Sequence, residues 1–354
     1  MIAEFHAKAL AEIAGAKLVA AYNRSPAKGR DFAAKHGIAF AETPAALLAN
    51  PDVDIVCLCT PSGDHLAPAL ACAKAGKHVV VEKPLEVTLA RCDELNAACA
   101  QAGVTVAGIL PRRFGAGAVA LKAALTDERF GKLTLAGALI PWWRTQAYYD
   151  SAAWRGTFAL DGGGAVMNQG IHTIDLLLWF LGEPKRVSAT AGLVAHAGIE
   201  VEDIATGWIE FANGCRATLA SSTACWSATG FPAEIRIHGT TGAAVLRDDK
   251  LTAFEFEKSL PADASVVASA TEGGGAGAND PKAIGHAWHR ANLEDAVAAI
   301  RAGRRPAVDG AEGRKAVELI LALYQSAQAG GMPVELPLAK DPVLGLLGHK
   351  DLPP

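Results

Sequence analysis

The sequence predicts an α/β protein with a doubly wound parallel sheet at its N-terminal end and a second α+β domain with a large, mostly antiparallel sheet. Short apolar runs alternate with helical patterns up to about residue 110, which is typical of a parallel sheet covered by helices. Val79–Val81 is a run of three β-branched residues, as in a strand buried on both faces. After Pro111 longer β-like runs dominate, which indicates a different kind of sheet.

The first domain is expected to span residues 1–112. Apolar runs predict its strands, and patterns of period 3.6 predict its helices. The strands are expected at 17–22, 38–40, 54–59, 79–81 and 105–109, and the later helices at 27–36, from Pro44, at 65–75 and at 88–102. Gly76 suits the position just beyond the helix that ends at Ala75.

The second domain is expected to span residues 113–338, with two closing helices over about 287–329 and a C-terminal tail at 339–354. A helix over 117–126 precedes six strands, expected at 133–142, 186–194, 204–211, 216–225, 234–238 and 243–246. Asn213-Gly214 predicts a hairpin turn between two of these strands. Thr271–Asn279 is rich in glycine and indicates a surface loop.

A charged pair, Glu82-Lys83, follows the strand Val79–Val81, and Pro84 ends the strand because proline lacks a backbone donor. Ligands of open α/β sheets bind at the carboxyl ends of the strands. We therefore expect Lys83 to lie close to a bound ligand. For an isolated strand-Lys-Pro sequence, a solvated lysine in a loop is the better interpretation. The functional interpretation of Lys83 therefore depends on a second polar segment.

That second segment is Asp161–Asp175, in which three glycines precede a helical pattern. Asn168 and His172 are four residues apart, and His172 and Asp175 three apart, so all three are expected on one helix face. An amide, an imidazole and a carboxylate side by side suit the binding of a polyhydroxylated substrate and the transfer of one proton. A lone histidine here is more often a core residue, but two polar partners favour a functional one.

Several short motifs occur together in a fixed order. They are Thr60-Pro61 with His65, Ala75–Val79 leading into Glu82-Lys83-Pro84, Trp154-Arg155-Gly156, the triple glycine with His172, and Ala316–Ser326. As an ordered set, from Met1 to about Leu338, they resemble the family named for glucose–fructose oxidoreductase, inositol dehydrogenase and MocA.

This resemblance implies an NAD(P)-dependent oxidoreductase that acts on a sugar, inositol or related polyol, free or carrying an anionic or nucleotide group. It implies that Lys83 and His172 are catalytic, with His172 accepting the hydroxyl proton and Lys83 stabilising the charged oxygen. Asn168 stands where many members carry aspartate, so it can bind a hydroxyl but cannot act as a base. Asp175 is expected to orient His172 or bind a hydroxyl, and the alternative role is a salt bridge on the helix surface. Two alternatives stay open: a truncated, non-catalytic ligand-binding or regulatory relative, and an NAD-assisted glycosidase of the same family.

Further substrate-binding residues are expected where aromatic and arginine side chains gather. The stretch 142–156 is dense in both, and such groups bind sugar rings, carboxylates and phosphates. The candidates are Tyr149, Trp154, Arg155 and, from an earlier segment, Arg113. For each tryptophan, ordinary core packing is an equally good interpretation.

The residues expected to bind the cofactor share positions at strand ends and at the start of the chain. They are Met1, Ile2, Asn23, Arg24, Ser25, Thr60, Pro61, His65, Glu82 and Lys83. NAD enzymes place a carboxylate after the second strand, on the ribose 2′-hydroxyl. This chain has Asn23-Arg24-Ser25 there and no acid before Asp31, which tilts the prediction towards NADP.

The chain opens on Met1–Leu10, which looks like the tail of a dinucleotide-binding fingerprint followed by its first helix. A Rossmann-like domain has a strand and Gly-x-Gly before that point. We therefore expect an in-frame extension with a strand ending in Gly-x-Gly, in preference to a truncated relative.

Net charge, the length of apolar runs and cysteine content limit further what kind of protein this is. The formal net charge of −4 argues against nucleic acid as a partner, and no apolar run is long enough to span a bilayer. Seven cysteines form an odd set without zinc spacing, so we expect no metal site and a reducing cytoplasm. A wide sheet with one face uncovered would expose apolar surface, which predicts a homodimer or homotetramer.

Overall fold

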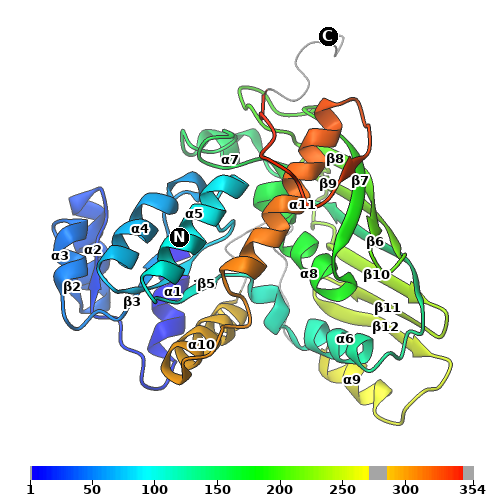
Figure 1. Ribbon diagram of the computed structural model, residues 1–354, viewed down its shortest axis with the longest axis horizontal. Coiled ribbons are helices and arrows are strands. Elements are labelled where there is room, and N and C mark those ends of the chain that lie inside the picture. Colours follow the sequence, from blue (N-terminus) through cyan, green and yellow to red (C-terminus); the bar gives the residue numbers. More distant parts are fainter. Residues whose placement is uncertain (1, 271–284, 346–354) are drawn as a thin grey trace. The chain divides into compact units, whose positions relative to one another are not determined.

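The computed structural model describes residues 2–270 and 285–345 (Figure 1). The chain forms two compact units. Unit 1 comprises Met1–Glu86, Arg91–Leu110 and His286–Gly313, and unit 2 comprises Val87–Ala90, Pro111–Gly285 and Arg314–Pro354. Met1, the expected loop at 271–279 and the end of the expected tail lie outside the described residues. Within the described ranges, no helix combines the length and apolar character needed to cross a membrane.

Unit 1 alternates strands and helices, as its apolar pattern predicted. Its elements are α1 (Ile2–Ala11), β1 (Ala20–Ala21), α2 (Pro26–His36), β2 (Ala39–Phe40), α3 (Pro44–Ala49), β3 (Ile55–Leu58), α4 (Leu66–Lys74), β4 (His78–Val81), α5 (Leu89–Gln101), β5 (Val106–Gly108) and α10 (Ala287–Ala302). All strand pairs are parallel, in the orders β1-β2 and β3-β4-β5. The parallel sheet is confirmed, but among described residues β1 and β3 have no strand between them, so it is divided in two.

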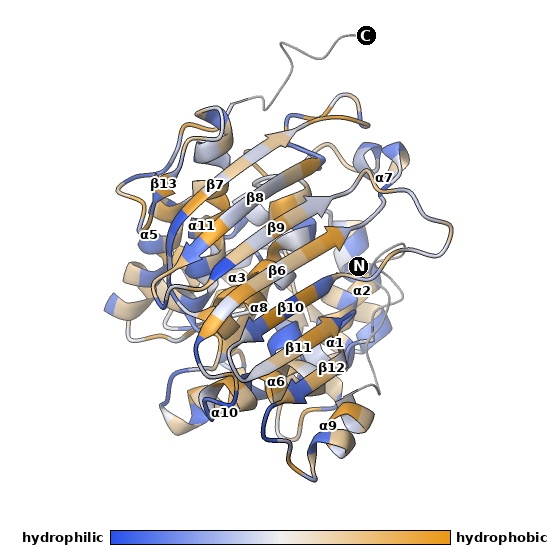
Figure 2. Cartoon of the chain, turned by 90° about the vertical axis from the view of Figure 1, so that its right-hand side faces the viewer, coloured by the Kyte–Doolittle hydropathy of each residue, from blue (hydrophilic) through white to orange (hydrophobic). Residues whose placement is uncertain are grey.

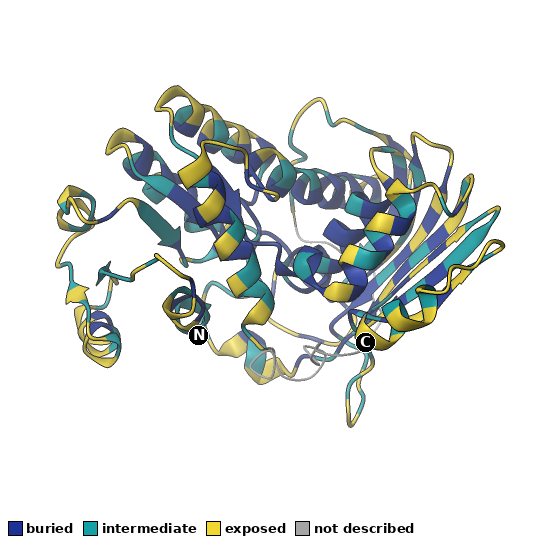
Figure 3. Ribbon diagram, turned by 90° about the horizontal axis from the view of Figure 1, so that it is seen from below, coloured by how far each residue is buried: buried dark blue, intermediate teal, exposed yellow. Residues whose placement is uncertain are grey.

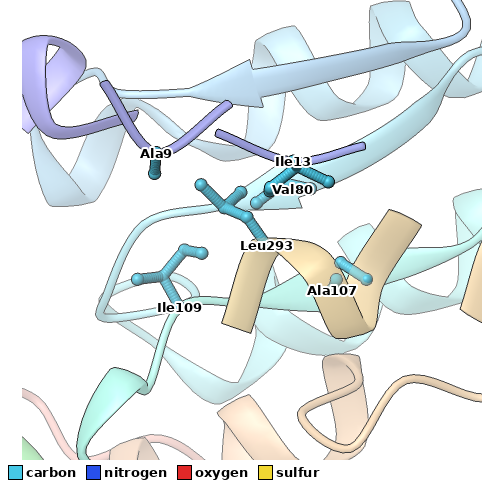
Figure 4. Packing of buried hydrophobic residues seen from close by; sticks show 7 residues of the cluster. Ala9, Ile13, Val80, Ala107, Ile109 and Leu293 are labelled. Atoms are coloured by element: carbon cyan, nitrogen blue, oxygen red, sulfur yellow. The ribbon is translucent and has the colours of Figure 1, made fainter. Parts of the chain in front are cut away.

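The core of unit 1 forms around β4, whose Val80 is 1% exposed. Figure 4 shows Val80 beside Ile13 and Leu293 of α10, with Ala9 in the same cluster. Asn292, next to Leu293, accepts a hydrogen bond from the Leu110 amide (2.9 Å) and donates one to the Gly108 carbonyl (3.2 Å). We expected α10 in the second domain, but its apolar side completes the core of unit 1.

Unit 2 is built on one large sheet. Its elements are α6 (Ala116–Thr126), β6 (Leu133–Pro141), α7 (Gln146–Asp150), a π-helical turn (Ala165–Gly170), α8 (Ile171–Leu181), β7 (Pro184–Gly192), β8 (Ile204–Phe211), β9 (Arg216–Ser222), β10 (Glu234–Gly239), β11 (Gly242–Arg247), β12 (Lys250–Phe256), α9 (Asp263–Ala270), α11 (Gly310–Gln328) and β13 (Val334–Glu335). The strand order is β12-β11-β10-β6-β9-β8-β7-β13. Only β6 and β9 pair in parallel, so the expected antiparallel character is confirmed.

The two faces of this sheet differ. Along its strands buried and exposed residues alternate, as the period of two requires (Figure 3). The buried face packs on α8, which contacts β6 and β10. The opposite face mixes polar side chains with exposed apolar ones, among them Leu135, Leu139 and Trp208 (Figure 2). Gly214, with φ of +87°, forms the turn between β8 and β9 that Asn213-Gly214 predicted.

Candidate functional site

In unit 1, polar residues follow the carboxyl ends of β3 and β4. His65 is fully buried, and its ring lies 3.1 Å from the Thr60 carbonyl oxygen (Nε2) and 3.0 Å from that of Pro84 (Nδ1). Burial lowers the pKa of His65. We expected Thr60, Pro61 and His65 to bind the cofactor. In the structure the His65 ring joins the loops after β3 and β4.

Glu82, at the end of β4, forms a buried pair with His6 of α1, with Nε2 and Oε1 2.7 Å apart. Burial acts to raise the pKa of Glu82, but the hydrogen bond with His6 and the positive charges of His6, His289 and Lys83 together outweigh burial and lower it to about 2. The pKa of His6 is raised well above its usual value, because Cys59, Cys57 and Glu82 outweigh the effect of burial. His6 was not predicted from the sequence, because its partner Glu82 lies 76 residues away.

Lys83 follows directly and is half-buried, and its amide donates to Oε2 of Glu82 (3.2 Å). The buried Glu82–His6 pair therefore anchors the backbone from which Lys83 extends. A dinucleotide held at the carboxyl ends of β3 and β4 would lie within reach of this lysine. The residues present at these strand ends fit a nicotinamide cofactor.

A second group of candidates follows β1. The side-chain oxygen of Asn23 accepts a hydrogen bond from the Ser25 amide (2.8 Å), and this forms a turn that leads into α2. The Arg24 guanidinium is largely exposed and lies 3.3 Å from a carboxylate oxygen of Asp64. Ile2 is the first residue of α1. The largely exposed guanidinium of Arg24 thus lies near a carboxylate of the protein itself.

In unit 2, the backbone of the glycine-rich segment is hydrogen-bonded to Glu202, which is fully buried. Its carboxylate accepts the Gly164 amide (3.0 Å), the Val166 amide (2.8 Å) and the Tyr324 hydroxyl (3.0 Å). A Cβ at Gly164 would collide with the Glu202 carbonyl oxygen, and one at Gly163 with the Tyr324 hydroxyl. Glycine is required because this backbone approaches both residues closely. Burial raises the pKa of Glu202 to about 7, although its hydrogen bonds act to lower it.

The segment that donates hydrogen bonds to Glu202 does not form one regular helix. Residues Ala165–Gly170 form a π-helical turn, and α8 begins at Ile171. Since a π turn closes hydrogen bonds over five residues, the expected common face of Asn168, His172 and Asp175 does not follow from α-helical spacing. Asn168 and His172 are half-buried, whereas Asp175 is 1% exposed. The Asn168 amide donates to Asp161.

Asp175 forms a bidentate ion pair with Arg113, at 2.6 and 2.9 Å, and both side chains are buried. We expected both residues to bind substrate, and Asp175 alternatively to orient His172. The structure pairs their charges with each other in the interior of unit 2. Arg113 also stacks on Trp179, 5.6 Å from the ring centroid.

The aromatic and arginine residues gather at α7 and the loop that follows it. Arg155 is half-buried, with its guanidinium 4.2 Å from the ring centroid of Tyr148 and 4.5 Å from that of Trp154. Tyr149, which we expected to bind substrate, is 5% exposed and hydrogen-bonds Thr223 through its hydroxyl (2.8 Å). Its neighbour Tyr148 is the tyrosine whose ring contacts Arg155. The sequence places both in the aromatic stretch but does not indicate which one faces the core.

Comparison with known protein families identifies both units. The family model described as "Oxidoreductase family, NAD-binding Rossmann fold" matches residues 1–108, and that described as "GFO/IDH/MocA C-terminal domain" matches residues 118–245.

Individual relatives agree with these matches. The chain is 30% identical to 1,5-anhydro-D-fructose reductase of Ensifer adhaerens, over 66% of this chain and 69% of the relative. It is 27% identical to inositol 2-dehydrogenase of Rhizobium meliloti, over 72% and 75%. Among solved structures, the WlbA dehydrogenase of Bordetella pertussis, in complex with NADH and UDP-GlcNAcA, superimposes with a TM-score of 0.87 at 29% identity, over 95% of each chain.

Proposed function

The chain belongs to the GFO/IDH/MocA family of NAD-binding oxidoreductases, and from this membership we propose that it transfers a hydride between a nicotinamide and a hydroxyl carbon of a sugar, inositol or related polyol. The observation that carries the proposal is that both expected catalytic side chains are half-buried within ordered segments: Lys83 at the end of β4 and His172 at the start of α8. Sugar-related relatives support this substrate class, which includes nucleotide-linked compounds such as the UDP-GlcNAcA of the Bordetella protein.

The nicotinamide, when bound, supplies the hydride chemistry. His172 accepts the proton of the reacting hydroxyl during oxidation, since imidazole titrates near neutral pH. Lys83 hydrogen-bonds a substrate oxygen and stabilises the negative charge that develops on it. Asn168 binds a neighbouring hydroxyl, and Arg155 with Trp154 binds the remainder of the substrate.

The remaining proposals concern cofactor preference and assembly. Arg24 and Ser25, with no acid before Asp31, favour NADP over NAD. The exposed Leu139 and Trp208 on the outer face of the large sheet favour a homodimer or homotetramer formed through that face.

A turnover assay tests the function directly. Purified protein is screened for NAD(P)H formation with inositols, sugars and sugar derivatives, and the best substrate is used with variants. Lys83→Ala and His172→Ala are each expected to lower kcat by roughly 10²–10⁴-fold, the usual scale for lost acid–base or charge-stabilising help. His238→Ala, which removes an exposed histidine of β10, is the control. If His172→Ala keeps near-normal turnover, the proton carrier is assigned wrongly.

A further inference from the structure

Tyr148 has a hydroxyl whose acceptor capacity is already used. Its oxygen accepts a hydrogen bond from Nη1 of Arg155 (2.7 Å) and another from Nε2 of Gln169 (2.9 Å). A phenolic oxygen has two lone pairs and one proton to donate. Within the described part of the chain, no protein group accepts that proton. The hydroxyl is therefore held as a donor for a group that is not part of the protein chain described.

Arg155 beside it is also incompletely satisfied. Its Nε donates to the Ser151 hydroxyl (3.1 Å) and its Nη1 to Tyr148, while the plane of the guanidinium stacks on two aromatic rings. Among residues 2–270 and 285–345, Nη2 has no acceptor and no carboxylate forms an ion pair with Arg155. A half-buried cation that is fixed in orientation and lacks a counter-ion indicates an anionic ligand.

The charges around Tyr148 favour an anionic ligand. Buried Arg144 binds the Trp143 carbonyl (2.8 Å) and Oε1 of Gln169 (2.8 Å), so it orients the same network. Burial raises the pKa of Tyr148, the charges of Arg155 and Arg144 act to lower it, and that of Asp161 acts to raise it. The two arginines therefore favour an anion near the Tyr148 hydroxyl. A carboxylate matches the two donors in number, with one oxygen for the O–H of Tyr148 and one for Nη2–H of Arg155.

We propose that Tyr148 and Arg155 bind a carboxylate of the substrate, one oxygen on the tyrosine O–H and the other on Nη2–H of the arginine. This rests on the proposed function and narrows its substrate class to sugar acids. Gln169, which hydrogen-bonds the tyrosine, directly follows Asn168 and lies three residues before His172. The carboxylate is thus bound in the same unit as the residues proposed to bind and deprotonate the reacting hydroxyl.

The test is a binding measurement that needs no turnover. Isothermal titration calorimetry is performed on the full chain with NAD⁺ or NADP⁺ present, using D-glucuronate and D-galacturonate, their neutral counterparts D-glucose and D-galactose, and D-glucose 6-phosphate. At least one sugar acid should bind at least 10-fold more tightly than its neutral counterpart and than the phosphate. Tyr148→Phe should weaken this binding by about 10-fold and Arg155→Met by about 100-fold, because neutral and charged hydrogen bonds differ in strength.

Arg186→Met is the matched control. Arg186 also stacks on a tryptophan, Trp208, but is already ion-paired with Glu210, so its loss should leave sugar-acid affinity unchanged. The proposal is overturned if no sugar acid binds at millimolar concentration, if acid and neutral sugar bind equally, if the phosphate binds most tightly, or if Arg155→Met weakens acid and neutral sugar alike.

The two proposals can fail separately. Binding of a sugar acid that depends on Arg155, without any NAD(P)H formation, would remove the proposed oxidoreductase function and keep the carboxylate site. Oxidation of neutral polyols that is indifferent to Arg155→Met and Tyr148→Phe would keep the oxidoreductase function and remove the carboxylate site.

Discussion

Replacing Glu202 with glutamine is expected to remove a pH-dependent part of the stability of unit 2. The carboxylate of Glu202 is fully buried beneath the glycine-rich segment and accepts hydrogen bonds from two backbone amides and a tyrosine hydroxyl. Burial raises its pKa from 4.5 to about 7. In the unfolded chain the same group titrates near its ordinary value.

The direction of the effect follows from proton binding. Between about pH 4.5 and 7 the folded state holds a proton on Glu202 that the unfolded state has lost, so raising the pH favours unfolding. The stabilisation is fully present below the unfolded pKa and is lost as the pH rises through the folded one. At about 1.4 kcal/mol per pH unit, this shift corresponds to about 3 kcal/mol lost by pH 8.

The assay is guanidinium chloride unfolding at several values between pH 5 and 8, followed by tryptophan fluorescence. Apart from Trp288, the tryptophans lie in unit 2, so the signal reports mainly on that unit. Glu202→Gln should be less stable than wild type overall, because its side-chain amide nitrogen would face a hydrogen-bond donor. The difference in the free energy of unfolding between variant and wild type should shift in favour of the variant by about 2–3 kcal/mol from pH 5 to 8. Glu255→Gln, at an exposed position of β12, is the control. Equal pH slopes for wild type and Glu202→Gln would refute the reasoning.

Four further predictions concern single side chains. Asn168→Ala should raise KM more than it lowers kcat, and Asn168→Asp should retain or raise activity, as steady-state kinetics will show; a collapse of kcat in the alanine variant would contradict a purely binding role. Asp175→Asn should lower the free energy of unfolding, measured with denaturant, by about 3–5 kcal/mol, because it leaves the buried guanidinium of Arg113 without its carboxylate. An unchanged unfolding midpoint would count against this. Trp208→Glu should yield monomers by light scattering, whereas a monomeric wild type would disprove assembly through that face. Arg24→Ala should raise the KM for NADP by about 10-fold and leave that for NAD unchanged; an equal effect on both removes the NADP preference.

The order of the elements could be predicted from sequence because apolar periodicity is a local property. Val79–Val81 is buried in β4 as its composition indicated, and the Asn213-Gly214 turn lies between β8 and β9. The strand β12 was missed because its hairpin turns at Asp248-Asp249, both with positive φ, where glycine or asparagine is the usual signal.

The site was harder to predict because its details depend on contacts between distant residues. The π-helical turn before α8 contains Val166, whose amide donates to Glu202, 36 residues away, and no periodicity in the sequence indicates this turn. The pairing of Asp175 with Arg113 joins residues 62 positions apart. Which of Tyr148 and Tyr149 is buried is decided by Thr223, which lies 74 residues beyond Tyr149.

The position of α10 has a consequence for how the chain is made. Unit 1 is discontinuous, since Leu293 and Asn292 complete a core that otherwise consists of residues up to Leu110. A ribosome therefore synthesises the strands from β6 to β12 before the last part of unit 1 emerges. Until then the apolar surface around Val80 and Ala107 lacks its cover. The nascent N-terminal segment is thus expected to expose this surface for most of translation, and a fragment ending near residue 110 is expected to aggregate when expressed alone.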